Sequence, residues 1–249
     1  MSHKLIFLIG GSAAYDAMAE AFISAAGGCD AKIALLLQSR AGWEKHGGEI
    51  VRPWVQRGAS QHTPITPGED GTLDLAAASA ALRDATGIFI GGGHTPTYHR
   101  LYATEPVRGL IRERYRQGVS VAGVSAGALI SLEHCALTAS ETGEAGLRIV
   151  PGLDLARGFC IGVHFTEQND LPNVIEAMGQ TGTETAWGLD EPACAVFEDG
   201  RLAGVLGQSV FKITMFDFAT NDHQITKYTA PLTFRNGHSD GAPYRRNHS

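Results

Sequence analysis

The sequence is poor in cysteine, has few charged residues and contains no long apolar run, and each shortage excludes a class of protein. Its four cysteines stand singly, without Cys-x-x-Cys pairs or a disulfide framework. No apolar stretch is long enough to cross a membrane. A formal net charge of −6 without a basic stripe argues against nucleic acid and anionic membrane surfaces as partners. We therefore expect a cytoplasmic protein that binds neither nucleic acid nor membranes.

The usual signatures of cofactors and metal ions are also missing. Gly10-Gly11-Ser12 follows the first apolar run, but its glycines lack the spacing of a dinucleotide-binding turn, and there is no Walker lysine. The sequence has no His-x-x-x-His or His-Glu-x-x-His pattern around His94, His99 or His134. We predict neither a cofactor nor a metal ion.

Short aliphatic runs alternate with helical patterns along most of the chain. The runs at 5–9, 31–37, 87–90, 119–122 and 159–165 have the character of buried strands. This alternation predicts an α/β fold with a doubly wound, mostly parallel sheet. From residue 186 onward the pattern changes to short strands, and the Asp199-Gly200 turn predicts a hairpin. We expect one domain over 1–234, with extra short C-terminal strands, and a polar, frayed tail over 235–249.

The stretch Gly123-Val124-Ser125-Ala126-Gly127 joins one apolar run to the next. Glycines two residues before and after the serine suit a sharp strand-to-helix turn, which would expose the Ser125 hydroxyl beyond the end of the sheet. Such a serine can be a nucleophile. It can also be no more than the N-cap of a helix in an ordinary loop.

Two other loops are expected at the same edge of the sheet, where ligand sites of α/β folds form. Gly92 and Gly93 follow the strand at 87–90, and His164 ends the strand at 159–165. His164 can serve as the base for Ser125, while the backbone N–H of Ala126 and one from Gly92 or Gly93 would hold an oxyanion. A histidine with a purely structural role is the alternative.

A third group should orient the imidazole of His164. Glu141 is our first choice and Glu144 our second, because both lie in a polar segment between Ser125 and His164. Asp190-Glu191 is a more distant candidate, which also suits a cap or rim of the site.

These motifs together resemble the cyanophycinase and aspartyl dipeptidase (dipeptidase E) family of serine peptidases. The resemblance covers about residues 87–197 and rests on Gly91-Gly92-Gly93-His94-Thr95, Gly123-Val124-Ser125-Ala126-Gly127-Ala128, Ser140-Glu141-Thr142, Val163-His164-Phe165 and Gly188-Leu189-Asp190-Glu191. It implies a class I glutamine amidotransferase-like fold, that is, a flavodoxin-like three-layer sandwich. It also implies that Ser125 is the nucleophile, His164 the base and Glu141 the acid.

Two departures from the family pattern concern the substrate. Where the family has His-Phe-x-x-Arg-x-Arg, this chain has Gln168 and Asp170, so it lacks the guanidinium groups that would clamp an aspartyl carboxylate. His94 stands where the family tends to have asparagine or glutamine. We therefore expect peptides that begin with aspartate to be poor substrates, unless Arg148 or Arg157 replaces the clamp. We expect the substrate to meet His94, Thr95, Gln168 and Asp190.

The predicted function is a serine peptidase that hydrolyses a short peptide or isopeptide through an acyl-enzyme. An amidase or esterase on the same scaffold is one alternative, and a catalytically silent binding protein is another. A glutamine amidotransferase would need cysteine in place of Ser125. The expected partner is the small peptide or isopeptide itself, and a homodimer is a possible assembly.

Overall fold

The computed structural model describes residues 3–235, 238–239 and 244–246. Its α-helices are α1 (Tyr15–Ala25), α2 (Arg40–Val55), α3 (Leu75–Asp84), α4 (Thr95–Tyr102), α5 (Val107–Arg116), α6 (Ala126–Ser131), α7 (Ala139–Thr142) and α8 (Leu171–Thr181). Its strands are β1 (Leu5–Ile9), β2 (Lys32–Leu36), β3 (Gln61–Ile65), β4 (Gly87–Ile90), β5 (Ser120–Val124), β6 (His134–Leu137), β7 (Arg148–Pro151), β8 (Cys160–Val163), β9 (Thr185–Leu189), β10 (Ala193–Glu198), β11 (Arg201–Gly207), β12 (Ser209–Asp217), β13 (Asp222–Thr229), β14 (Leu232–Arg235), β15 (His238–Ser239) and β16 (Tyr244–Arg246).

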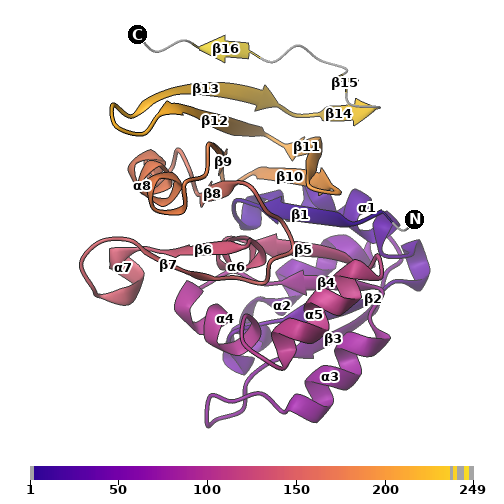
Figure 1. Ribbon diagram of the computed structural model, residues 1–249. Coiled ribbons are helices and arrows are strands. Elements are labelled where there is room, and N and C mark those ends of the chain that lie inside the picture. Colours follow the sequence, from indigo (N-terminus) through magenta and orange to yellow (C-terminus); the bar gives the residue numbers. More distant parts are fainter. Residues whose placement is uncertain (1–2, 236–237, 240–243, 247–249) are drawn as a thin grey trace.

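The larger sheet has the order β15-β14-β11-β10-β1-β5-β4-β2-β3 (Figure 1). The five strands from β1 to β3 in this order run parallel, as expected for a doubly wound fold, and β10 adds an antiparallel extension next to β1. The α/β prediction is therefore confirmed. The predicted Asp199-Gly200 turn joins β10 to its antiparallel neighbour β11.

Alternate residues of β1 explain why helices cover both faces of this sheet. Ile6 and Leu8 belong to one buried cluster, which includes side chains of α3, α4 and α5. Phe7 and Ile9 belong to another, which includes side chains of α1 and α2. Successive side chains of a strand point to opposite faces, so a strand covered on both sides must be apolar throughout.

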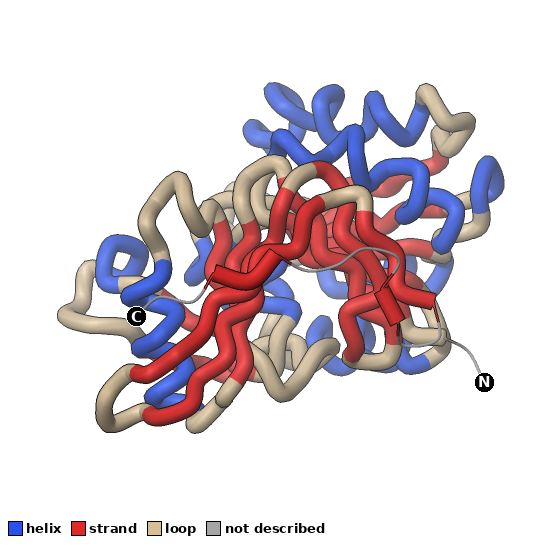
Figure 2. The backbone as a smooth tube through the Cα atoms, turned by 90° about the horizontal axis from the view of Figure 1, so that it is seen from above, coloured by secondary structure: helices blue, strands red, loops and turns tan. Residues whose placement is uncertain are grey.

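After β5 the chain leaves the first sheet, whereas we expected from the sequence that the strand at 159–165 would end at the same edge of one sheet. The strand expected at 159–165 is β8, and it lies in a second sheet with the order β16-β13-β12-β9-β8. β8 and β9 run parallel, while β12 and β13 form an antiparallel hairpin. Seen from above (Figure 2), strands occupy the middle of the molecule with helices around them. Of the tail expected at 235–249, residues 235, 238–239 and 244–246 belong to strands β14, β15 and β16, and the remainder lies outside the described residues.

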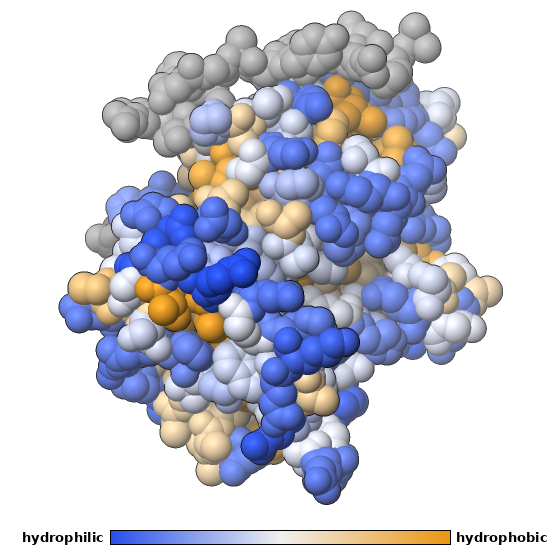
Figure 3. Space-filling view, turned by 180° about the vertical axis from the view of Figure 1, so that it is seen from behind, coloured by the Kyte–Doolittle hydropathy of each residue, from blue (hydrophilic) through white to orange (hydrophobic). Residues whose placement is uncertain are grey.

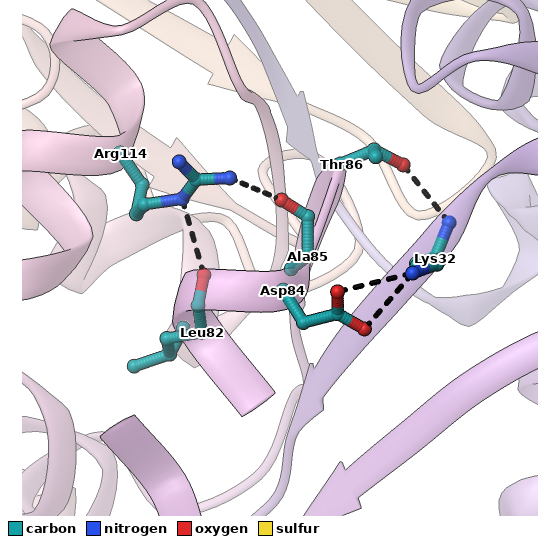
Figure 4. A network of polar contacts seen from close by, with 6 residues as sticks. All are labelled: Lys32, Leu82, Asp84, Ala85, Thr86 and Arg114. Atoms are coloured by element: carbon teal, nitrogen blue, oxygen red, sulfur yellow. Dashed lines mark hydrogen bonds and ion pairs between the residues drawn. The ribbon is translucent and has the colours of Figure 1, made fainter. Parts of the chain in front are cut away.

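A polar network ties the helices to the amino ends of the parallel strands (Figure 4). The Lys32 ammonium group lies 3.0 Å from Asp84 at the end of α3, and the Lys32 backbone N–H donates to Thr86. Arg114 of α5 donates to the carbonyl oxygens of Leu82 and Ala85. These contacts fix the edge of the sheet opposite the carboxyl ends of the strands.

The surface seen from behind in Figure 3 is mostly hydrophilic, and its hydrophobic residues form small separate patches. No helix in the described ranges combines the length and the hydropathy needed to span a bilayer.

Candidate active site

Backbone hydrogen bonds order the strand ends of each sheet near Ser125. The N–H of Ser125, just after β5, donates to the carbonyl of Ile9 at the end of β1, at 2.9 Å. In the second sheet, the N–H of Phe165, after β8, donates to Leu189 at the end of β9, at 3.1 Å. The Gly10 N–H donates to Ala193, the first residue of β10, and residues 190–192 connect β10 to β9 of the second sheet. Loops from both sheets therefore surround Ser125.

The backbone at Ser125 has the sharp turn that the glycines predict. Ser125 has φ 50° and ψ −112°, a conformation that a residue with a side chain adopts only when its surroundings hold it there. A Cβ atom added to Gly123 would lie 2.5 Å from the carbonyl oxygen of Gly127. A Cβ atom on Gly127 would clash with the carbonyl of Ile90. Glycine is needed at both places because the backbones of β4, β5 and α6 approach so closely.

Ser125 and His164 are within hydrogen-bonding distance, although 39 residues separate them in the sequence. The Ser125 hydroxyl oxygen lies 2.9 Å from Nε2 of His164. The other ring nitrogen, Nδ1, lies 3.1 Å from a carboxylate oxygen of Glu191. His164 also has a positive φ of 48° and is 19% exposed, so its imidazole is held in place by a constrained backbone and by packing.

Glu141, our first choice for the third group, has different partners. Its carboxylate accepts hydrogen bonds from the backbone and hydroxyl of Thr95 and from the backbone and hydroxyl of Thr138. With Thr138 it forms the capping box of α7. Glu144 lies 3.4 Å from Arg148 in an exposed ion pair. The structure thus places Glu191, rather than Glu141 or Glu144, beside the imidazole.

Strand pairing explains the position of Glu191. β9 is the parallel neighbour of β8, so the residues after β9 emerge beside those after β8. The Glu191 N–H donates to Glu167 at 3.1 Å, and the Asp190 carboxylate accepts from the Thr166 N–H at 3.0 Å. A Cβ atom on Gly11 would lie 2.9 Å from Cγ of Glu191, so the bare Gly11 backbone leaves room for this side chain. In the sequence, the Gly10-Gly11 pair is therefore the local sign that another segment packs closely against this loop.

The glycine loop after β4 lies against Ser125. A Cβ atom on Gly92 would lie 3.4 Å from Cβ of Ser125. The Gly92 carbonyl accepts a hydrogen bond from the Tyr98 hydroxyl at 3.2 Å, and this contact fixes the direction of the trans N–H of Gly93. In a second hydrogen bond of this loop, the Gln38 side chain accepts from the His94 N–H at 2.9 Å.

Two cavities flank the serine, and Gly93, Ser125 and His164 line both. The larger has a volume of about 580 Å³, and its wall includes Tyr15, Trp43 and Glu49. The smaller has a volume of about 300 Å³. Thr95, Glu141, Gln168 and Asp170 are among its polar lining residues. The arrangement provides one reactive centre with space on each side for a part of a substrate.

Of the four residues expected to meet the substrate, two line the smaller cavity and two make contacts within the protein. Thr95 and Gln168 line the smaller cavity. His94 instead uses its ring nitrogens to hold Thr97, at 2.9 Å, and the Glu141 carbonyl, at 3.1 Å. Asp190 holds the loop after β8, and burial raises the pKa of its carboxyl group.

The two arginines considered as replacement clamps lie elsewhere. Arg148 pairs with Glu144, and Arg157 pairs with Asp154 beside a separate cavity. Among the described residues no group of three histidine, cysteine or acidic side chains is placed to hold a metal ion.

Comparison with known proteins identifies relatives across most of the chain. The profile of peptidase family S51 matches residues 70–204. A cyanophycinase from Nostoc sp. (strain PCC 7120 / SAG 25.82 / UTEX 2576) is 28% identical over 198 residues, which cover 76% of this chain and 65% of that protein. A cyanophycinase from Synechococcus elongatus is 26% identical over 221 residues, covering 86% of this chain and 68% of that protein. The chain thus spans about two thirds of the length of these relatives.

Two solved structures share the fold. A peptidase from an acI-B1 Actinobacterium superposes with a TM-score of 0.62 at 18% identity, covering 94% of this chain and 95% of that one. A putative peptidase E protein from Listeria monocytogenes EGD-e superposes with a TM-score of 0.58 at 14% identity, covering 86% of this chain and 100% of that one. Since the family profile matches more than half of the sequence, the chain belongs to peptidase family S51.

Proposed function

We propose that this protein is a serine peptidase that hydrolyses a short peptide or isopeptide through an acyl-enzyme. The observation that carries the proposal is the chain of contacts from the Ser125 hydroxyl to His164, at 2.9 Å, and from His164 to Glu191, at 3.1 Å. A hydroxyl needs an adjacent base to become a nucleophile at neutral pH, and the base needs a partner that sets its tautomer.

The proposed reaction begins with attack of the Ser125 oxygen on the carbonyl carbon of the substrate. Nε2 of His164 takes the hydroxyl proton, while the Glu191 carboxylate accepts the hydrogen bond from Nδ1–H and stabilises the imidazolium. The tetrahedral intermediate collapses, the C–N bond breaks, and His164 returns the proton to the leaving amine. Water then attacks the ester by the same route in reverse, which frees the acid product and Ser125.

The negative oxygen of the intermediate needs hydrogen-bond donors. α6 begins at Ala126, and the first N–H groups of a helix have no acceptor within the helix. The Ala126 N–H is therefore available next to the nucleophile. The Gly93 N–H is our choice for the second donor, because Gly93 lines both cavities and Tyr98 fixes the orientation of its peptide.

A fluorophosphonate probe tests the nucleophile directly, because it reacts with an activated serine whatever the natural substrate. We expect stoichiometric labelling at Ser125 of the wild type, and at least about a thousandfold slower labelling in Ser125→Ala and His164→Ala. Ser24→Ala, which removes an exposed hydroxyl from α1, is the matched control and should react like the wild type.

Turnover of a dipeptide library separates the remaining possibilities. Labelling together with peptide turnover supports a peptidase. Labelling with turnover of simple esters or amides, but of no peptide, would favour an amidase or esterase. A wild type that neither reacts with the probe nor turns over any of these compounds would refute the enzymatic proposal.

A further inference from the structure

The smaller cavity beside Ser125 is acidic. Glu141 and Asp170 both line it, and none of the described residues in its wall is lysine or arginine. The one basic side chain there is His164, which already serves Ser125 and Glu191. A carboxylate-bearing substrate group would therefore meet repulsion in this cavity, whereas a cation would be attracted.

Glu141 supplies a charge whose position is fixed. Its two carboxylate oxygens accept hydrogen bonds from Thr95 and Thr138, so the side chain cannot rotate away from the cavity without losing them. The buried Thr95, itself in the cavity wall, holds the charge next to the reactive centre.

Asp170, which also lines the cavity, supplies the second charge. It precedes α8, yet within the described structure its carboxylate makes no capping hydrogen bond to that helix. One of its oxygens accepts a hydrogen bond from the Asn173 amide at 2.8 Å. The other points toward β8, since a Cβ atom on Gly162 would lie 2.7 Å from it. Helix capping therefore does not account for a carboxylate at this place.

Burial raises the pKa of the Asp170 carboxyl group, and the nearby charge of Glu141 adds to this effect. A cation bound near Asp170 would offset this cost of its negative charge. This observation agrees with the geometry but is secondary to it.

Part of the wall of the cavity is apolar. Ile161 and Val163 of β8 face it together with Val174 and Ala177 of α8, and Leu147 adds to the wall from another segment. All of these except Leu147 are buried. A side chain that combines an aliphatic stem with a charged end matches such a wall, because the stem can cover the apolar groups while the end reaches the carboxylates.

We propose that this cavity binds a cationic side chain of the peptide substrate, of the lysine or arginine type, and that Asp170 and Glu141 determine this specificity. The inference rests on the proposed peptidase function, because it concerns the cavity next to the same nucleophile. It assigns a substrate class opposite in charge to an aspartyl group.

Dipeptides of the form Xaa-Leu and Leu-Xaa, with lysine, norleucine or glutamate as Xaa, provide the test. Norleucine retains the aliphatic stem of lysine without the charge. In one of the two series we expect kcat/KM to be about tenfold to a hundredfold higher for lysine than for norleucine, with glutamate the poorest. Asp170→Asn should bring the lysine-to-norleucine ratio of kcat/KM down to about one. Glu176→Gln, which removes a charge from α8 outside this cavity, should keep the lysine preference.

The outcomes separate this inference from the proposed function. Fluorophosphonate labelling without a lysine preference in either series, or an unchanged preference in Asp170→Asn, would overturn the inference and leave the peptidase proposal intact. If the wild type were neither labelled nor active, the binding of the same peptides to Ser125→Ala, measured by calorimetry, would still test the cationic site. Tighter binding of the lysine peptide than of the norleucine peptide, abolished by adding Asp170→Asn, would support the cationic site. Equal binding would refute it.

Discussion

Nδ1 of His164 lies 3.1 Å from Oε1 of Glu191, a residue 27 positions further along the chain. The Glu191 side chain is 44% exposed, so its negative charge is only partly desolvated. Its contribution should therefore come mainly from orienting the imidazole and selecting the tautomer in which Nε2 can accept a proton.

Isosteric substitutions distinguish Glu191 from Glu141. We expect Glu191→Gln to slow fluorophosphonate labelling by about a hundredfold or more, with little change in folding stability. We expect Glu141→Gln to slow labelling less than about tenfold but to lower the free energy of unfolding by roughly 1–3 kcal/mol, because an amide group would face the donors of Thr95 and Thr138. Labelling kinetics and urea unfolding measure the two effects. Slower labelling in Glu141→Gln than in Glu191→Gln would return Glu141 to the catalytic role.

The turn at Ser125 should tolerate no side chain at Gly127. Alanine normally favours a helix over glycine, but here its Cβ would clash with the Ile90 carbonyl. We expect Gly127→Ala to destabilise the fold by about 1–3 kcal/mol. Gly179→Ala is the matched control, because Gly179 lies in α8 with no atom within 4 Å of the added Cβ, and it should stabilise by about 0.5–1 kcal/mol. Urea midpoints that moved in the same direction for both variants would contradict this explanation.

Thiol reactivity provides a test of the packing. Cys29 is exposed, while Cys135, Cys160 and Cys194 are buried, and burial raises the pKa of each of these three thiols. Because the thiolate is the reactive form, Ellman's reagent should titrate one thiol rapidly in the folded protein and four in urea. Cys29→Ser should abolish the rapid phase. More than one rapidly reacting thiol in the folded wild type would contradict the burial of Cys135, Cys160 and Cys194.

The stability of the protein should depend on the ionisation of Asp170. Burial raises the pKa of its carboxyl group above the ordinary value of 3.8, so the folded state binds this proton more tightly than the unfolded state. The ionised carboxylate therefore lowers stability above the folded pKa, and this cost disappears as the pH falls below 3.8. We expect Asp170→Asn to be more stable than the wild type at pH 7.5, with the difference shrinking toward acidic pH. Urea midpoints at several pH values measure this, and a pH-independent difference would exclude the ionisation as its cause.

Local patterns were sufficient to predict much of the fold. Uninterrupted apolar runs such as Leu5–Ile9 indicate strands covered on both faces, and β1 divides its side chains between two clusters. The glycines around Ser125 predicted the tight turn because their requirement is steric and involves neighbouring backbone. The helix at 171–181 was not predicted. The second sheet was not predicted either, because the partner strands of β8 come from later segments of the chain.

The sequence by itself determined which residues end the strands, including Ser125 and His164, because apolar runs and glycine turns are local properties. Only the tertiary structure decided which carboxylates lie near them. Chain order favoured Glu141, which lies between the two, but parallel pairing of β8 with β9 delivers Glu191 to the imidazole. The packing of α8 on β8 brings Asp170 into the lining of the smaller cavity, which Glu141 also lines. Proximity in this site follows from strand neighbours, and hydrogen bonding between distant segments establishes those neighbours.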